Sequence, residues 1–190
     1  VDWDAFERAI TPRTKAFLLC NPHNPTGRVY SREDLTRMAE ICLRRNLWII
    51  ADEIHCDLLF AGQRHVPIAS LGPEVERRTI TLMSPSKTFN LAGAHYGACF
   101  TTNPALKAKL DARIAASGLA SYNAFGMIAT EAAWRTGDDW LDALLPYLAG
   151  SRDMLDSRIE RAAPGARSMR LDATYLAWVD FSGTGLPASD

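Results

Sequence analysis

Short apolar runs that end at polar or turn-forming residues alternate with amphipathic segments along this 190-residue chain. The first run stops abruptly at Asn21-Pro22 and has the pattern of a strand buried on both faces of a parallel sheet. Strand, helix and strand recur in this order, which predicts an α/β fold with mostly parallel pairing. The four predicted strands lie within residues 15–20, 47–54, 78–86 and 96–102.

The helical segments carry their own start signals. Ser31, with Asp34 three residues later, predicts a capped amphipathic helix, and Asn103-Pro104 predicts the start of another. Residues 121–161 are mostly helical in pattern, with a break at 136–139 where an aspartate is expected to cap the second helix. That helix should lead out of the sheet, and residues 171–181 are expected to form a strand of a second, incomplete domain.

The charge balance gives no sign of a polyanionic partner. Lysine and arginine number 21 against 22 aspartates and glutamates, for a net charge of −1, and no basic run is present. Nucleic acid and anionic membranes are therefore not expected as partners. No apolar run approaches the ~20 residues that span a bilayer. The four scattered cysteines predict reduced core thiols in a cytoplasmic protein, and His23 and His65 are expected at the surface.

Polar side chains follow three of the predicted strands at the point where each ends. These are the turn 21–27, the string 51–55 and the string 84–87. Ligands of open α/β sheets bind beyond the carboxyl ends of the strands, so these side chains predict one site. The string ADEIH also resembles the acidic box of DExH helicases. That interpretation requires a phosphate-binding G-x-x-x-x-G-K-[ST] loop and a basic groove, and the sequence has neither.

Asp52 lies within an apolar string and needs a positive partner, because a lone carboxylate is costly to bury. Lys87 could be that partner in a plain ion pair. Alternatively, a cofactor with a protonated ring nitrogen could pair with Asp52 and leave the Lys87 amine free to condense with an aldehyde. The second arrangement is the one that pyridoxal phosphate (PLP) requires.

Three strings in this order, NPHNPTGRVYS (21–31), ADEIH (51–55) and SPSKTFNLAGAHYG (84–97), resemble the PLP enzymes of the aminotransferase class I and II superfamily, fold type I. Within it they look most like the cystathionine β-lyase and cysteine-conjugate β-lyase branch. Such enzymes are about twice as long, so this chain is expected to be a central part of one. The resemblance implies a three-layer α/β fold, with residues 1–143 in the large PLP-binding domain and 144–190 as the linking helix and start of a smaller α+β domain.

The resemblance also implies roles for particular residues. Lys87 matches the lysine that holds PLP covalently and then moves the proton at the substrate Cα. Asp52 matches the aspartate on the pyridine nitrogen. Asn24 matches the residue that bonds the phenolic oxygen, and Ser84 and Ser86 match phosphate-binding hydroxyls.

Two histidines depart from the transaminase pattern. At His55 transaminases usually carry a tyrosine that bonds the phenolic oxygen, and histidine here is typical of the β-lyase branch. His95 stands where many members place an arginine on the phosphate, so no phosphate role is assigned to it. The function implied is a PLP-dependent C–S β-lyase that eliminates a thiolate from Cβ of an amino acid, leaving pyruvate and ammonia.

Two alternatives stay open: a class I/II aminotransferase, or a truncated, non-catalytic domain of such an enzyme. The 190 residues alone are expected to be inactive, since the ring-stacking aromatic and the substrate-carboxylate arginine of the family pattern fall outside them. The resemblance further implies a cytoplasmic homodimer with a small amino-acid substrate and no metal.

Overall fold

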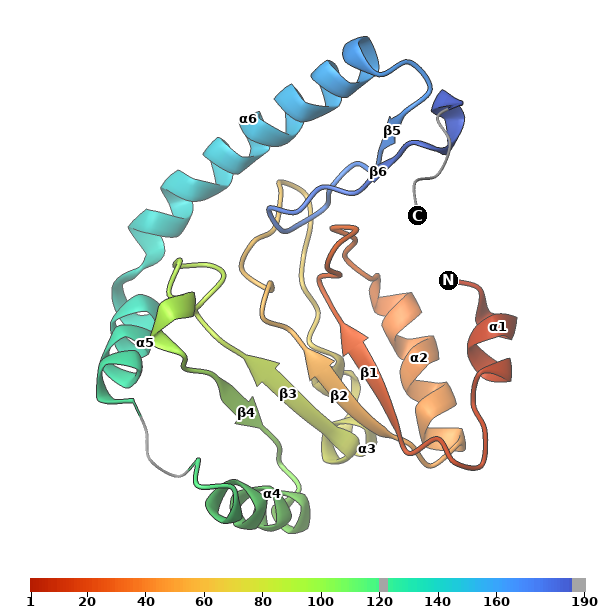
Figure 1. The fold of residues 1–190 in the computed structure, drawn as a ribbon. Helices are drawn as coiled ribbons and strands as arrows, with labels where there is room; N and C mark the ends of the chain where they lie inside the picture. Colours follow the sequence, from red (N-terminus) through yellow and green to blue (C-terminus); the bar gives the residue numbers. More distant parts are fainter. Residues whose placement is uncertain (120–122, 186–190) are drawn as a thin grey trace.

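The computed structural model describes residues 1–119 and 123–185 and has an α/β architecture (Figure 1). Four strands form one sheet in the order β1 (Ala16–Cys20), β2 (Trp48–Asp52), β3 (Thr79–Met83) and β4 (Ala98–Phe100). The first three pair in parallel, and β4 is antiparallel to β3. The prediction of an α/β fold with a mostly parallel sheet is confirmed.

The helices begin where their caps predict. The Ser31 hydroxyl accepts a hydrogen bond from the Asp34 amide (3.0 Å), and the Asn103 side chain accepts one from the Leu106 amide (3.1 Å). The α-helices of the described residues are α1 (Trp3–Arg8), α2 (Arg32–Arg44), α3 (Pro73–Arg78), α4 (Pro104–Ala116), α5 (Ala124–Thr136) and α6 (Asp138–Ala162); short 3-10 helices are η1 (Ile68–Leu71), η2 (Ala92–Ala94) and η3 (Ser182–Thr184).

The hydrophobic core lies between the sheet and α2. Leu35 and Met38 of α2 pack with Leu19 of β1 and Ile49 of β2, and all four are at most 3% exposed. Leu18 points to the opposite face of the sheet and is 68% exposed. The first strand is therefore buried on one face among the described residues, not on both as predicted, because α2 covers only the face that carries Leu19.

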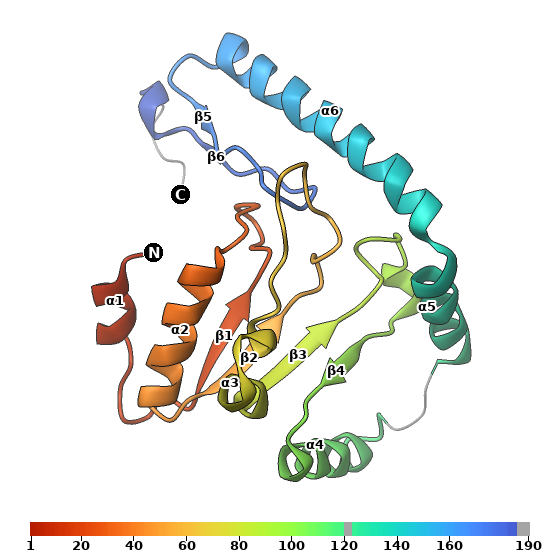
Figure 2. The same cartoon turned by 180° about the vertical axis from the view of Figure 1, so that it is seen from behind.

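The helical second half breaks at the predicted position, between Thr136 and Asp138. The expected aspartate cap is wrong, because Gly137 occupies the cap position and no side chain bonds the first turn. α6 then continues through Pro146 without interruption and runs from α5 to the hairpin of β5 and β6 (Figure 2). No helix within 1–119 and 123–185 is long and apolar enough to span a membrane.

The predicted strand at residues 171–181 is wrong for most of its length. Within it β6 (Val179–Asp180) pairs with β5 (Arg167–Ser168) in a short antiparallel ladder, and Ala173 forms an isolated antiparallel bridge with Leu59. The chain between β5 and β6 descends onto the loops of the first sheet (Figure 1), where the amides of Asp172 and Ala173 both donate to the Gly27 carbonyl (3.0 and 2.9 Å). These residues place their backbone hydrogen bonds in loops, so they cannot also form a regular ladder.

Candidate functional site

Three parallel strands end at one edge of the sheet, and the predicted site residues lie in the loops that follow them. Cys20 at the end of β1 pairs in register with Asp52 at the end of β2, and Asp52 pairs with Leu82 of β3. The loops after these strands hold Asn24, His55 and Lys87. Parallel pairing thus gathers at one edge residues that lie far apart in the sequence.

Lys87 lies half-buried in the turn that follows β3. The turn is closed by two backbone hydrogen bonds, from Phe89 to the Pro85 carbonyl (2.9 Å) and from Leu91 to the Ser86 carbonyl (3.1 Å). Within the described residues no carboxylate oxygen lies within 4.0 Å of the Lys87 amine. The plain Asp52–Lys87 ion pair that the sequence left open is therefore not formed.

A cavity of about 290 Å³ opens beside Lys87. One wall comes from the turn after β3, a second from α6, and the third from the segment between β5 and β6. The turn contributes polar groups and α6 contributes apolar groups, so the Lys87 amine borders a cavity that is polar on one side and apolar on the other. The lining residues are Ser86, Lys87, Thr88, Asn90, Ala92, Trp140, Leu144, Leu148 and Tyr175.

His55 is the most deeply buried of the predicted site residues, with 2% of its surface exposed. Its Nδ1 atom is buried and has no hydrogen-bond partner among the described residues. Burial, and then the positive charge of Lys87, lower the pKa of His55, while the Asp52 carboxylate raises it. The imidazole is therefore neutral at pH 7, and it lies within the fields of both Lys87 and Asp52.

Asp52 is half-buried, and its Oδ1 atom accepts a hydrogen bond from the Ile54 amide (3.2 Å). Cys20 lies between Asp52 and the turn after β1, where its thiol accepts a weak hydrogen bond from the backbone amide of Asn24 (3.5 Å). Burial raises the pKa of the Cys20 thiol, and the negative charge of Asp52 adds to this effect. Asn24 itself is exposed, so its side-chain amide is accessible at this edge of the sheet.

The two predicted phosphate hydroxyls are in different situations. Ser84 donates its hydroxyl to the Tyr96 carbonyl (2.7 Å) and accepts from the Ser86 amide (3.1 Å), so it orders the turn. Ser86 lines the cavity beside Lys87. His95 is exposed and adopts a left-handed backbone conformation with φ of 49° at the end of η2.

Two residues of the site were missed by sequence reasoning. Trp140 of α6 donates its indole N–H to the Thr88 carbonyl (3.0 Å), directly after Lys87. Tyr175 packs its ring against His55, with centroids 5.7 Å apart and planes at 71°. Tyr175 falls in the strand predicted at 171–181, and Trp140 in the predicted helical region. Nothing in the local pattern of either string distinguishes a site residue from a core residue.

His65 was predicted to lie at the surface, and this prediction is wrong. Its side chain is 10% exposed. The Nε2 atom donates to the buried carboxylate of Glu53 (2.9 Å), and the Nδ1 atom accepts from the side-chain amide of Asn21 (3.5 Å). His23 is also partly buried, with its Nδ1 atom 2.8 Å from the Thr26 hydroxyl. Both histidines satisfy polar neighbours. The described residues contain no group of three or more metal-ligating side chains.

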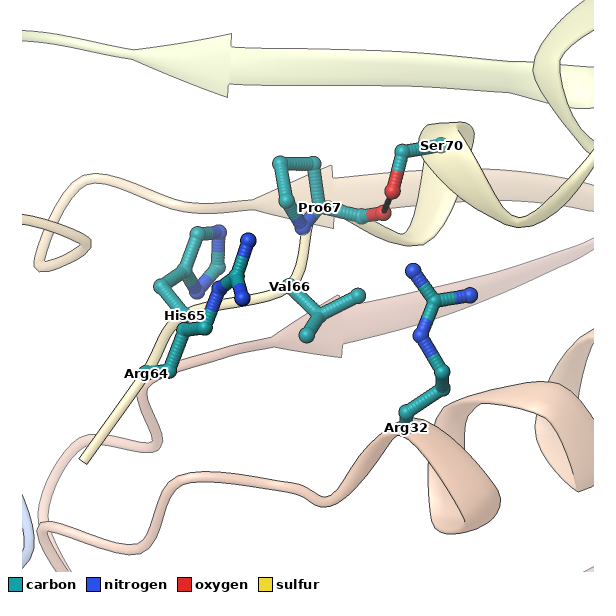
Figure 3. Close-up of a pocket in the computed structure, with 6 residues that line it drawn as sticks. All are labelled: Arg32, Arg64, His65, Val66, Pro67 and Ser70. Carbon is teal, nitrogen blue, oxygen red and sulfur yellow. Dashed lines mark hydrogen bonds between the residues drawn. The ribbon is translucent and has the colours of Figure 1, made fainter. Parts of the chain in front are cut away.

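A second hollow, of about 340 Å³, lies beside η1 and the start of α2 (Figure 3). The figure shows its six lining residues and the hydrogen bond from the Ser70 hydroxyl to the Pro67 carbonyl (2.7 Å). Apart from His65 its walls are aliphatic or exposed. None of the predicted site residues lines it, so the sheet-edge cavity remains the candidate site. The lining residues are Arg32, Arg64, His65, Val66, Pro67 and Ser70.

The model of the family described as aminotransferase class I and II matches residues 1–188. The chain belongs to this family. Cystathionine β-lyase PatB of Bacillus subtilis is 39% identical over 187 residues, which cover 98% of this chain and 48% of the relative.

Solved structures share the fold. A PLP-bound C–S lyase from Staphylococcus hominis superposes with a TM-score of 0.89 at 37% identity, covering 96% of this chain and 46% of the other. N-succinyldiaminopimelate aminotransferase from Mycobacterium tuberculosis superposes with a TM-score of 0.78 at 33% identity, covering 92% and 44%. The chain thus spans about half the length of the relatives that it matches.

Proposed function

We propose that this chain carries the cofactor-binding edge of a PLP-dependent C–S β-lyase similar to cystathionine β-lyase. The observation that carries the proposal is Lys87, an amine with no ion pair among the described residues, which lines a cavity and acts electrostatically on the buried imidazole of His55. The reaction would eliminate a thiolate from Cβ of an amino acid and leave pyruvate and ammonia. The β-lyase relatives support this class of reaction.

The residues of the sheet edge fit PLP by their chemistry. The buried Nδ1 atom of His55 has no hydrogen-bond partner in the part of the chain that the structure describes, which is costly unless a ligand or water meets it. We assign His55 and Asn24 to the phenolic oxygen, Asp52 to the pyridine nitrogen, and Ser86 to the phosphate. Ser84 was predicted to bind the phosphate as well, but its hydroxyl donates to the Tyr96 carbonyl, so we assign it to ordering the turn. Lys87 would hold the cofactor covalently. When bound, PLP supplies an electron sink for the electron pair released at the substrate Cα.

Each site residue has a separate role in the proposed reaction. Lys87, once displaced by substrate, removes the proton at Cα, for which an uncharged amine is required. Asp52 would pair through its carboxylate with the positively charged ring nitrogen. His55 remains neutral at pH 7, so it can bond an anionic oxygen only through its N–H group. Trp140 and Leu144 give the cavity an apolar wall opposite the turn that carries Lys87.

The aminotransferase reaction is the second candidate, and the matched mycobacterial aminotransferase favours it. The two reactions share the removal of the Cα proton by Lys87 and differ in the step after it. Pyruvate released from cystathionine without a keto-acid acceptor would support the lyase. Strict dependence of turnover on a keto-acid acceptor would reject it.

The assembly and location follow the same reasoning. We propose a homodimer in the cytoplasm, a location that four free thiols fit. We also propose that residues 1–143 belong to the large PLP-binding domain and that 144–190 form the linking helix and the start of the small domain. The course of α6 away from the sheet supports this division (Figure 1).

The first test is the absorption spectrum of the complete natural polypeptide with added PLP. We expect the band of a protonated lysine–PLP linkage, and its absence from the Lys87→Ala variant. Lys87→Arg is the matched control, because it keeps a positive charge but cannot form the linkage. A band that persists in both variants would remove Lys87 from its assigned role.

A further inference from the structure

His55 is buried without a hydrogen bond that fixes its ring. Among the described residues no hydrogen bond to either ring nitrogen is present, and only its backbone carbonyl is used, by the Leu58 amide (3.0 Å). The aromatic contact to Tyr175, at 5.7 Å between centroids and 71° between planes, is therefore the specific contact that orients the imidazole. Edge-to-face pairs of this kind are favourable beyond the area that they bury.

Tyr175 is brought to His55 by a segment that is docked, residues 171–174. The Gly27 carbonyl accepts from the amides of Asp172 and Ala173, and the Leu58 carbonyl accepts from the Thr174 amide (2.8 Å). On the other side, the Phe60 amide donates to the Asp172 carbonyl (3.0 Å). The segment thus joins the loop after β1 to the loop after β2.

Side chains reinforce this docking. Asp172 accepts hydrogen bonds from the Gln63 side chain (3.1 Å) and the Val29 amide (3.4 Å). Leu171, Ala173 and Thr174 are at most 5% exposed. Thr174 has a φ of 71° and accepts from the Leu176 amide (3.2 Å), which turns the chain immediately before and after Tyr175. A threonine in this conformation is costly, so the turn is held by its surroundings.

Tyr175 also lines the cavity that holds Lys87. It is 45% exposed, although Leu171, Ala173 and Thr174 nearby are buried, so it is not a core residue. One ring therefore contacts the buried imidazole and borders the space beside the amine. Its position depends on residues that lie more than a hundred positions earlier in the chain.

We propose that Tyr175 is a positioning residue of the site: docking of segment 171–174 between the loops after β1 and β2 sets the Tyr175 ring against His55 and closes one wall of the Lys87 cavity. This inference rests on the proposed function for its catalytic meaning. The contact between Tyr175 and His55 can be tested without PLP. Failure of the one and failure of the other are therefore distinguishable.

The test follows the His55 imidazole by ¹⁵N NMR in the complete polypeptide without cofactor. Lys87 and Asp52, the charged groups that act on His55, are unchanged in all variants. In Tyr175→Ala we expect the titration midpoint of His55 to move upward, because the ring becomes more accessible to water. In Tyr175→Phe, which keeps the ring, we expect the midpoint of the wild type. Tyr147→Ala, at an exposed tyrosine of α6 outside the cavity, is the matched control.

A second variant reaches the same contact without touching Tyr175. Gly27→Ala places a Cβ atom 2.5 Å from Leu171 Cδ2 and should displace the docked segment. We expect the His55 midpoint to move in the same direction as in Tyr175→Ala. If Tyr175→Ala does not fold, Tyr175→Leu replaces it with the same expectation. A His55 midpoint that is unchanged in these variants would overturn the inference.

The cofactor readout separates the two proposals. With PLP, Tyr175→Ala should still form the lysine linkage, but the pH dependence of its absorption band should differ from that of Tyr175→Phe. Absence of the band in the wild type, with the NMR shift present, would reject the proposed function and leave the contact established. A band with the wild-type pH dependence in Tyr175→Ala would overturn the positioning role.

Discussion

His65 and Glu53 form a buried pair in which Nε2 of the imidazole lies 2.9 Å from Oε2 of the carboxylate. Glu53 is 2% exposed, and its second oxygen accepts from the Ile68 amide (3.3 Å). The Asn21 amide bonds the other nitrogen of His65. Glu53 comes directly after Asp52, so this pair fixes the backbone at the start of the loop after β2, next to a residue of the site.

Replacing His65 by alanine should therefore destabilise the protein. The buried Glu53 carboxylate would lose its side-chain donor, and a hydrogen bond to a charged group is worth about 1.5–3 kcal/mol. Arg64→Ala is the matched control, since this neighbour is exposed and the change should stay within about 0.5 kcal/mol. Urea unfolding measures both; equal midpoints for the two variants would show that the pair contributes no stability.

The position of His65 illustrates what the sequence cannot supply. Asp52 and Lys87 were found because each lies at the end of an apolar run, and parallel pairing then brings them to one edge. His65 lies in a loop, between Arg64 and Val66, with no local pattern. Its burial depends on Glu53 and Asn21, from two other segments, and such contacts become known only when the chain is folded.

Gly27→Ala should be more harmful than the same change at Gly62. Both glycines have positive φ, 67° and 87°, so both substitutions carry a conformational cost of about 1 kcal/mol or more. Only at Gly27 does the new Cβ meet neighbours, Leu171 Cδ2 at 2.5 Å and the Ala173 carbonyl at 2.9 Å. We expect Gly27→Ala to lose about 1–3 kcal/mol more than Gly62→Ala in denaturant unfolding. Equal losses would show that segment 171–174 moves aside freely.

The same glycine explains why the C-terminal segment was predicted wrongly. The string TYLAWVDF alternates and is rich in strand-forming residues, which favours a strand by local propensity. In the structure only Val179–Asp180 of this string forms a strand among the described residues. At its start the chain bonds two loops instead, with Asp172 and Ala173 donating to the Gly27 carbonyl and Thr174 to the Leu58 carbonyl. Strand propensity reflects how residues pair with other strands in general. Here the hydrogen-bonding partners are carbonyls of specific loops, which propensity cannot predict.

Acidification should weaken the fold through His55. Its pKa is lowered in the folded state, first by burial, so between that pKa and the ordinary value of about 6.5 the unfolded chain binds more protons. Stability therefore rises with pH through this window and is lost as the pH falls below about 6.5. We expect His55→Gln to lose less stability than the wild type between pH 8 and pH 5. The packing cost of the variant is present at both pH values and cancels in this difference, so equal losses would contradict the prediction.

The cysteine thiols should be labelled at different rates, because they differ in burial. Burial raises the pKa of Cys42 to about 11 and that of Cys56 to about 12, whereas Cys99 is exposed. Thiols with such pKa values are less than about 0.1% ionised at pH 8, so labelling by an aromatic disulfide should begin at Cys99. Cys99→Ser should remove the fast phase, and a fast phase that survives would contradict this order.

The slow labelling of Cys56 depends on Asp57, which accepts from the Cys56 thiol (3.6 Å) and from the Thr88 hydroxyl (3.0 Å). Thr88 is the residue after Lys87, so this carboxylate joins the loop after β2 to the turn after β3. Thr88→Val keeps the volume but leaves Asp57 with only the weak thiol donor, and local opening should become easier. We expect faster labelling of Cys56 in Thr88→Val, with the rate at Cys99 unchanged. An unchanged Cys56 rate would mean that the turn holding Lys87 is fixed without the hydrogen bond between Thr88 and Asp57.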